Sequence, residues 1–251
     1  DMGHSPAGRQ RDGNHRHTGR YGYTSRQQTI APGTIKDVVK MIEYKGNIAY
    51  GDKLLCGGIE VSVKSGDCIL LCGANGSGKS TLLRTLAKEN PALVSMIPTG
   101  IPKVKGFNMH EFIRLGCDEG GRGNSKDSEK RMAAVLRQLG LEELQHRDIS
   151  TLSDGEFQKA CIAIALCSGK EILLLDEPTA FLDPGNRTMI LSCLREICSA
   201  GQAVVFSSHD IELSLNYCTE IWALGEDKRL HCAEGAAMRA LAESIFPKTV
   251  R

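Results

Sequence analysis

The residues with the clearest chemical potential form the run GANGSGKST at positions 73–81. It fits GxxxxGK[ST], a phosphate-binding loop (P-loop) in which a glycine-rich turn joins a strand to a helix. Backbone N–H groups left unpaired in such a turn can surround a phosphate chain. We expect Lys79 to reach the outer phosphates and the Ser80 hydroxyl to bind Mg²⁺. The expected phosphate-binding residues are Gly73, Ala74, Asn75, Gly76, Ser77, Gly78, Lys79, Ser80 and Thr81.

Two carboxylates and a histidine follow other apolar runs. Asp176 and Glu177 come directly after 172–175, which places them at the carboxyl edge of a buried parallel strand, where α/β sheets bind ligands. We expect Asp176 to hold Mg²⁺ through water and Glu177 to polarise the water that attacks a γ-phosphate. His209 follows the apolar run 203–206. It is expected to contact the γ-phosphate, although a histidine there can also be a mere neighbour of a helix cap.

Two other places leave more than one interpretation open. Ser153 and Gly155 precede a strongly apolar helical stretch, so this helix N-terminus could hold an anion. The spacing from Ser153 to Glu156 fits an ordinary capping box equally well. Tyr50 lies upstream of the P-loop, where its ring could stack on a base or pack at a strand end.

The rest of the chain supplies the elements that position these residues. Alternating apolar residues near 38–63 predict half-buried antiparallel strands, and short continuous apolar runs predict buried strands. Apolar residues at helical spacing predict helices between them, and the polar, glycine-rich stretch 116–127 predicts a connection. The expected later elements are a helix capped by Asn108 and reaching Leu115, helices at 128–139 and 157–167, a helix through Met189–Ile197, a hairpin at 220–232 anchored by Trp222, and a terminal amphipathic stretch at 236–246.

Composition bounds the class of protein. The 251 residues are 41% hydrophobic, which is enough for a sizeable core, and a formal charge of +1 gives no overall attraction to nucleic acid, so no such partner is expected. Residues 1–33 contain few large apolar residues and show no hydrophobic periodicity, which predicts a disordered tail rather than a secretory signal. The ten cysteines are scattered, so we expect reduced core thiols and a cytosolic protein.

Five segments in order, GANGSGKST, LSDGE, ILLLDEP, FLD and SSHD, together resemble the ABC-type ATPases across residues 34–246. The resemblance implies an α/β P-loop NTPase fold of ABC type, with a mainly parallel core sheet, an antiparallel β subdomain and a helical subdomain at about residues 100–160. The whole domain would span 34–251.

The same resemblance implies ATP-hydrolysing activity with ATP and Mg²⁺ in a homodimer, each ATP lying between one subunit's P-loop and the other's LSDGE. By this carry-over Ser153 and Gly155 face the partner subunit's γ-phosphate, and Glu177 is the catalytic base. Asp183 matches the aspartate between subunits, and His209 matches the γ-phosphate switch.

The phrase DEPTAFLD resembles the subgroup that powers import of iron-siderophore, haem or cobalamin. It implies integral-membrane permease subunits as partners, a substrate-binding protein as an indirect one, and a cytoplasmic location on the inner face of the membrane. A soluble ABC ATPase, as in iron-sulfur cluster assembly, stays an alternative, and a nucleotide kinase sharing only the P-loop is a weaker one.

One departure from the family concerns the glutamine expected after the strand at 93–97. The sequence there reads Met96-Ile97-Pro98-Thr99, so Thr99 is the candidate for that position. Its shorter side chain would reach Mg²⁺ or the attacking water only through a bridging water. Coupling between a permease and the site is therefore a specific question for this chain.

Overall fold

The computed structural model describes residues 40–118 and 125–247, so the predicted tail at 1–33 lies outside the described residues. The first described elements are the antiparallel strands β1 (Lys40–Tyr50) and β2 (Lys53–Lys64). Ile59, Val61 and Val63 are buried and alternate with polar residues, as expected for a sheet with one apolar face. The predicted antiparallel β region is confirmed.

The central sheet has six strands: β4 (Val94–Ile97), β5 (Ile172–Leu175), β6 (Ala203–Ser207), β3 (Cys68–Gly73), β7 (Glu220–Leu224) and β8 (Leu230–Glu234), in that spatial order. Neighbouring strands from β4 to β7 pair in parallel, and β8 pairs antiparallel with β7 at one edge. Every residue of β3, β5 and β6 is buried, which is why these strands read as continuous apolar runs. The mainly parallel sheet is confirmed.

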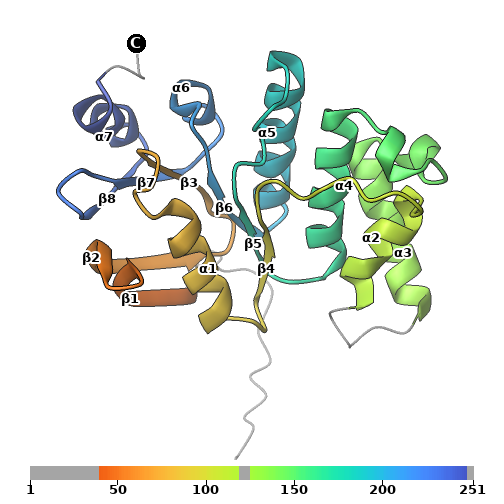
Figure 1. Cartoon of the computed structure of the whole chain (residues 1–251), viewed down its shortest axis with the longest axis horizontal. Helices are drawn as coiled ribbons and strands as arrows, with labels where there is room; N and C mark the ends of the chain where they lie inside the picture. The colour runs from red at the N-terminus through yellow and green to blue at the C-terminus, as the bar shows by residue number, and fades with distance from the viewer. Residues whose placement is uncertain (1–39, 119–124, 248–251) are drawn as a thin grey trace, which may run out of the picture. The chain divides into compact units, whose positions relative to one another are not determined.

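The two faces of this sheet form two hydrophobic clusters. Ile69 and Leu71 of β3 pack with α1 (Lys79–Glu89) and the β1–β2 sheet, whereas Leu70 joins a cluster with the later helices. This split follows from strand geometry, because successive side chains point to opposite faces. Figure 1 shows α1 on one side of the sheet and α5 (Pro184–Ser199) on the other.

The region between β4 and β5 is helical, with α2 (Met109–Asp118), α3 (Ser125–Leu139) and α4 (Asp154–Cys167), plus short turns at Glu142–Leu144 and Ile149–Thr151. Asn108 forms the predicted cap: its Oδ1 accepts from the Glu111 N–H at 2.9 Å. The predicted connection at 116–127 was too long, because α2 continues to Asp118 and α3 begins at Ser125. Gly116 lies against the backbone of Ile164, so the glycine lets α2 approach α4 closely and continues the helix.

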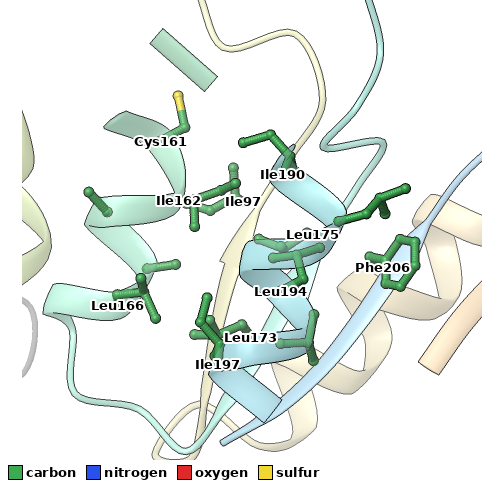
Figure 2. Packing of buried hydrophobic residues seen from close by; sticks show 14 of the residues in the cluster. Ile97, Cys161, Ile162, Leu166, Leu173, Leu175, Ile190, Leu194, Ile197 and Phe206 are labelled. Atoms are coloured by element: carbon green, nitrogen blue, oxygen red, sulfur yellow. The ribbon is translucent and has the colours of Figure 1, made fainter. Parts of the chain in front are cut away.

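A shared core fixes α4 and α5 against the sheet. Figure 2 shows side chains of α4 and α5 meeting those of β4, β5 and β6; all are buried: Ile97, Cys161, Ile162, Leu166, Leu173, Leu175, Ile190, Leu194, Ile197 and Phe206. The chain closes with α6 (Ile211–Ser214), the β7–β8 hairpin around the fully buried Trp222, and α7 (Ala237–Ile245). The packing therefore sets where both helices begin relative to the end of β5.

The cysteines behave as core residues. All ten are free thiols and seven are buried. Burial raises the pKa of Cys72 and of Cys161 to about 12, so both thiols stay protonated at neutral pH. The expectation of reduced, apolar cysteines is confirmed for most positions, with Cys232 exposed.

Candidate functional site

The P-loop joins β3 to α1 as the motif predicts. Gly76 and Gly78 have φ angles of 75° and 113°, which L side chains rarely adopt. A Cβ atom on Gly78 would also lie 2.8 Å from Ile48 Cδ1, so the position has no room for a side chain. No side chain caps the first turn of α1. Its N-terminal N–H groups are therefore available to an anion.

Lys79 is buried at the start of α1. Its Nζ donates to the carbonyl oxygens of Gly73 and Ala74, at 2.9 and 3.4 Å. Burial lowers the pKa of Lys79, and the negative charges of Glu177 and Asp176 oppose that shift. The ammonium group thus lies between the loop carbonyls and two carboxylates. It can exchange those carbonyl contacts for phosphate oxygens.

A pocket of about 360 Å³ opens beside the loop. Its lining comes from the P-loop, the β1–β2 hairpin and the end of β5: Tyr50, Lys53, Leu55, Asn75, Gly76, Gly78, Lys79, Ser80, Thr81 and Glu177. Tyr50 is 78% exposed at the pocket, so it does not pack at its strand end, and its ring is open to a base. Sequence reasoning missed Lys53 and Leu55, because only the pairing of Tyr50 with Lys53 across the hairpin brings β2 to the loop.

The two carboxylates lie at the carboxyl edge of β5. Asp176 is 3% exposed; its Oδ1 accepts a hydrogen bond from Ser207 Oγ at 2.7 Å, while its buried Oδ2 has no protein partner. Glu177 has a φ of 54°, which is unusual for a side chain of this size. Its backbone N–H donates to the same Ser207 Oγ at 2.8 Å. Sequence reasoning included Ser207 only within the segment SSHD, although a serine that closes an apolar run was the available signal.

A buried carboxylate oxygen without a donor costs free energy unless water or a cation supplies the missing contact. Asp176 Oδ2 is such an oxygen, and the Ser80 hydroxyl lines the adjoining pocket. These hard oxygen donors fit Mg²⁺, which is bound by one or two protein groups together with phosphates and waters. Within the described residues, no cluster of three or more His, Cys, Asp or Glu side chains could hold a metal by itself.

His209 meets Glu177 at the sheet edge. His209 Nε2 lies 2.7 Å from Glu177 Oε1, and their side chains are 49% and 24% exposed. The contact follows from topology, because β5 and β6 are neighbours and both residues come just after their strands. The pair can pass a proton or hold the carboxylate in place.

The N-terminus of α4 forms the capping box that its spacing allowed. Ser153 Oγ accepts from the Glu156 N–H at 3.2 Å, and Glu156 Oε2 accepts from the Ser153 N–H at 2.7 Å. A Cβ atom on Gly155 would lie 2.9 Å from the side-chain amide of Asn186, so the glycine lets α4 lie close to the start of α5. Neither Ser153 nor Gly155 lines the P-loop pocket. The structure thus separates LSDGE from the other predicted phosphate-binding residues.

Asp183 begins α5 as its N-cap, where its side chain accepts from the Asn186 N–H at 3.0 Å. That hydrogen bond is the main reason the pKa of the exposed Asp183 carboxyl is lowered. Nearby, Arg187 Nε donates to the Leu182 carbonyl at 2.8 Å, and Arg187 Nη1 lies 3.3 Å from Asp210 Oδ2. Arg187 therefore ties the turn before α5 to the segment that carries His209.

The remaining predicted residues lie outside the pocket lining. Thr99 is exposed in the turn after β4, and Asp183 is exposed at α5. Gly73 and Ala74 act through their carbonyls on Lys79, and Ser77 Oγ is buried without a hydrogen-bond partner. The part of the chain that the structure describes contains no helix that is both long and apolar enough to cross a bilayer.

Comparison with known proteins gives one consistent family. A family model described as "ABC transporter" matches residues 56–97 and 92–180. The chain is 30% identical to a hemin import ATP-binding protein of Deinococcus radiodurans, over 77% of this chain and 81% of that protein. It is 29% identical to a probable siderophore transport system ATP-binding protein of Bacillus subtilis, over 75% of this chain and 78% of that protein.

Solved structures show the same fold. A nucleotide-free ATP-binding cassette from an ABC transporter superposes with a TM-score of 0.71 at 20% identity, covering 82% of this chain and 95% of that one. An ATP-binding cassette in its ADP conformation also gives 0.71 at 20% identity, covering 84% and 97%. The motif order, the pocket and these matches agree: the chain belongs to the ABC transporter family as an ATP-binding subunit, and it is an ATPase.

Proposed function

We propose that this ATPase powers an importer for iron-siderophore, haem or cobalamin. The observation that carries the ATPase part is the single pocket formed by the P-loop, Tyr50 and Glu177, with Asp176 and His209 at its sheet edge. The choice of cargo class is supported by relatives whose names are those of siderophore, hemin and iron-hydroxamate import proteins. The cargo is not expected to touch this subunit.

In the proposed mechanism the ATP phosphates lie on the loop N–H groups and on Lys79, with the base against Tyr50. Mg²⁺ would be held by Ser80 and, through water, by Asp176, and when bound it neutralises charge on the phosphates. Glu177 orients and deprotonates the attacking water. His209, which already contacts Glu177, holds that carboxylate and reaches the γ-phosphate.

The site is proposed to be completed by a second copy of the chain. Ser153 and Gly155 do not line their own subunit's pocket, which supports their facing the γ-phosphate bound by a partner. A two-fold symmetric pair forms both sites at once. Asp183, exposed at the start of α5, is proposed to contact the other subunit.

Permease subunits are the proposed membrane partners, with a substrate-binding protein as an indirect partner. The region after β4 supports this, because it exposes the apolar side chains of Val104, Phe107 and Leu115 (48%, 41% and 52% exposed). The proposed location is the cytoplasmic face of the membrane, beneath those permease subunits. Thr99 lies in the same region and stays a prediction for the missing glutamine's position.

Uptake by cells tests the proposal. In cells lacking this protein, the wild-type gene should restore accumulation of one radiolabelled cargo among ferric siderophore, haem and cobalamin, and Lys79→Ala should not. Affinity purification from membranes should recover a multi-span permease. Recovery with soluble iron-sulfur assembly proteins only, together with normal uptake in cells lacking the gene, would contradict import and favour the soluble alternative.

A further inference from the structure

Ser207 lies beside Asp176 and Glu177, the two carboxylates at the carboxyl end of β5 that form the acid edge. It is the last residue of β6 and is fully buried. In the parallel ladder Phe206 pairs with Leu175, so the next residue of each strand places Ser207 beside Asp176. On its other side Ser207 pairs with Leu71 of β3, the strand that leads into the P-loop. One hydroxyl group is therefore set between the P-loop strand and the strand that carries the acids.

The direction of each hydrogen bond at Ser207 follows from its partners. The Glu177 backbone N–H is a donor only, so at 2.8 Å the Ser207 oxygen accepts from it. The single hydroxyl proton then goes to Asp176 Oδ1, 2.7 Å away. Both donor–acceptor distances are typical of good hydrogen bonds, and the bond to the carboxylate is charge-assisted.

The two bonds have separate consequences. The bond to Asp176 fixes its carboxylate through Oδ1 and leaves the buried Oδ2 without a protein partner. The bond from Glu177 holds its N–H in place, and the φ of 54° at Glu177 is an unusual conformation that its surroundings must maintain. That conformation places the Glu177 side chain against His209.

We propose that Ser207 is a positioning residue of the ATPase site, orienting Asp176 toward the metal and Glu177 toward the attacking water at the same time. The inference rests on the proposed binding of Mg²⁺ with the nucleotide. Ser207 is fully buried and does not line the pocket, so it acts by holding the two carboxylates in one orientation. Mutating a residue that orients a metal ligand commonly lowers metal affinity or activity by about 10- to 100-fold.

Calorimetric titration of ADP, with Mg²⁺ and then with EDTA, separates this role from catalysis. In the wild type Mg²⁺ should tighten ADP binding, and Ser207→Ala should reduce that gain by about tenfold while leaving the Mg²⁺-free affinity within about twofold. Ser207→Thr, which keeps the hydroxyl, should retain the gain within about threefold. ATP turnover by Ser207→Ala should fall by about tenfold or more.

Val205→Ala is the matched control for lost packing. Val205 is fully buried on the same strand, and its apolar side chain cannot form a hydrogen bond with Asp176 or Glu177. It should lower the melting temperature and leave the Mg²⁺-dependent gain unchanged. An unaltered gain in Ser207→Ala, or an equal loss in Val205→Ala or Ser207→Thr, would overturn the role of Ser207. Wild-type protein that binds ADP without any gain from Mg²⁺ would instead overturn the proposed metal site.

Discussion

The acid edge at β5 and the N-terminus of α4 are both predicted to face phosphate, yet they differ in how they satisfy their own polar groups. At the acid edge Asp176 Oδ2 is buried without a partner, and Glu177 is held at a positive φ. At α4 the Ser153–Glu156 capping box satisfies donors and acceptors within the chain. The first region is incomplete without a ligand, whereas the second is already a stable helix end.

This difference separates two kinds of functional residue. At the acid edge, an unpaired oxygen on Asp176 and an unusual φ at Glu177 occur in groups proposed to act on a ligand bound by their own subunit. The fully capped N-terminus of α4 carries no such mark. In the proposed dimer its ligand is bound by the other subunit and reaches it only on association. Ser153 is a structural cap and, in the proposal, also a contact for a partner's nucleotide. The two roles can be separated by substitution.

Removing the charge at the P-loop should have the largest effect. Lys79→Ala should lower steady-state ATP turnover by about 10²- to 10³-fold, because an electrostatic contact to the developing phosphate charge is lost. Phosphate release measures it. Lys88→Ala, in the last turn of the same helix, is the control and should keep wild-type turnover. Turnover by Lys79→Ala within twofold of wild type would remove the P-loop from the mechanism.

A substitution that keeps the cap and adds charge should separate the two roles of Ser153. Aspartate caps helices as well as serine, so Ser153→Asp should leave the melting temperature nearly unchanged. Its negative charge facing a γ-phosphate should lower ATP turnover by about tenfold or more. Ser153→Ala is the reciprocal control and should lose about 1 kcal/mol of stability. Normal turnover in Ser153→Asp would make the capping box the whole explanation.

Glu220 is a third acid, away from both regions, and burial is the largest cause of its pKa shift. Burial raises the pKa of Glu220 to about 7, although its Oε1 accepts from Trp222 Nε1 at 2.6 Å. Glu234 and Asp67 add to the shift. Between the unfolded pKa of 4.5 and about 7 the folded state holds more protons, so the free energy of unfolding falls as the pH rises.

Glu220→Gln should remove that pH dependence while keeping an acceptor for Trp222. Its stability relative to wild type should be unchanged near pH 4.5 and about 1 kcal/mol greater at pH 8, after allowance for solvent screening. Urea unfolding at the two pH values measures the difference. A stability difference that does not change with pH would show that burial does not penalise this carboxylate.

The sequence predicted the two carboxylates of the acid edge but not the contact that holds them in position. Buried strands and the P-loop were readable because apolar runs and fixed glycine spacing are local features. The bond from Ser207 to Asp176 was not readable, since it depends on β6 lying beside β5, and strand order is a property of the whole fold. Lys53 was missed for the same reason, because only hairpin pairing brings it to the pocket.

The end of α2 was predicted wrongly because one local sequence feature has two structural meanings. The polar residues of 116–127 predicted a long connection, but Gly116 is a packing contact against Ile164 inside the structure. A glycine that allows two helices to approach and a glycine that ends a helix look alike in sequence. Only the position of α4 separates the two cases.

The mass of the ATP-bound protein tests the shared site most directly. Glu177→Gln should bind ATP with Mg²⁺ without hydrolysing it, and light scattering after size exclusion should then give twice the 27.2 kDa chain mass. Adding Ser153→Asp to the same chain should return the mass to that of one chain while ATP still binds. A Glu177→Gln protein that stays monomeric with saturating ATP, or a double variant that dimerises equally well, would contradict the account.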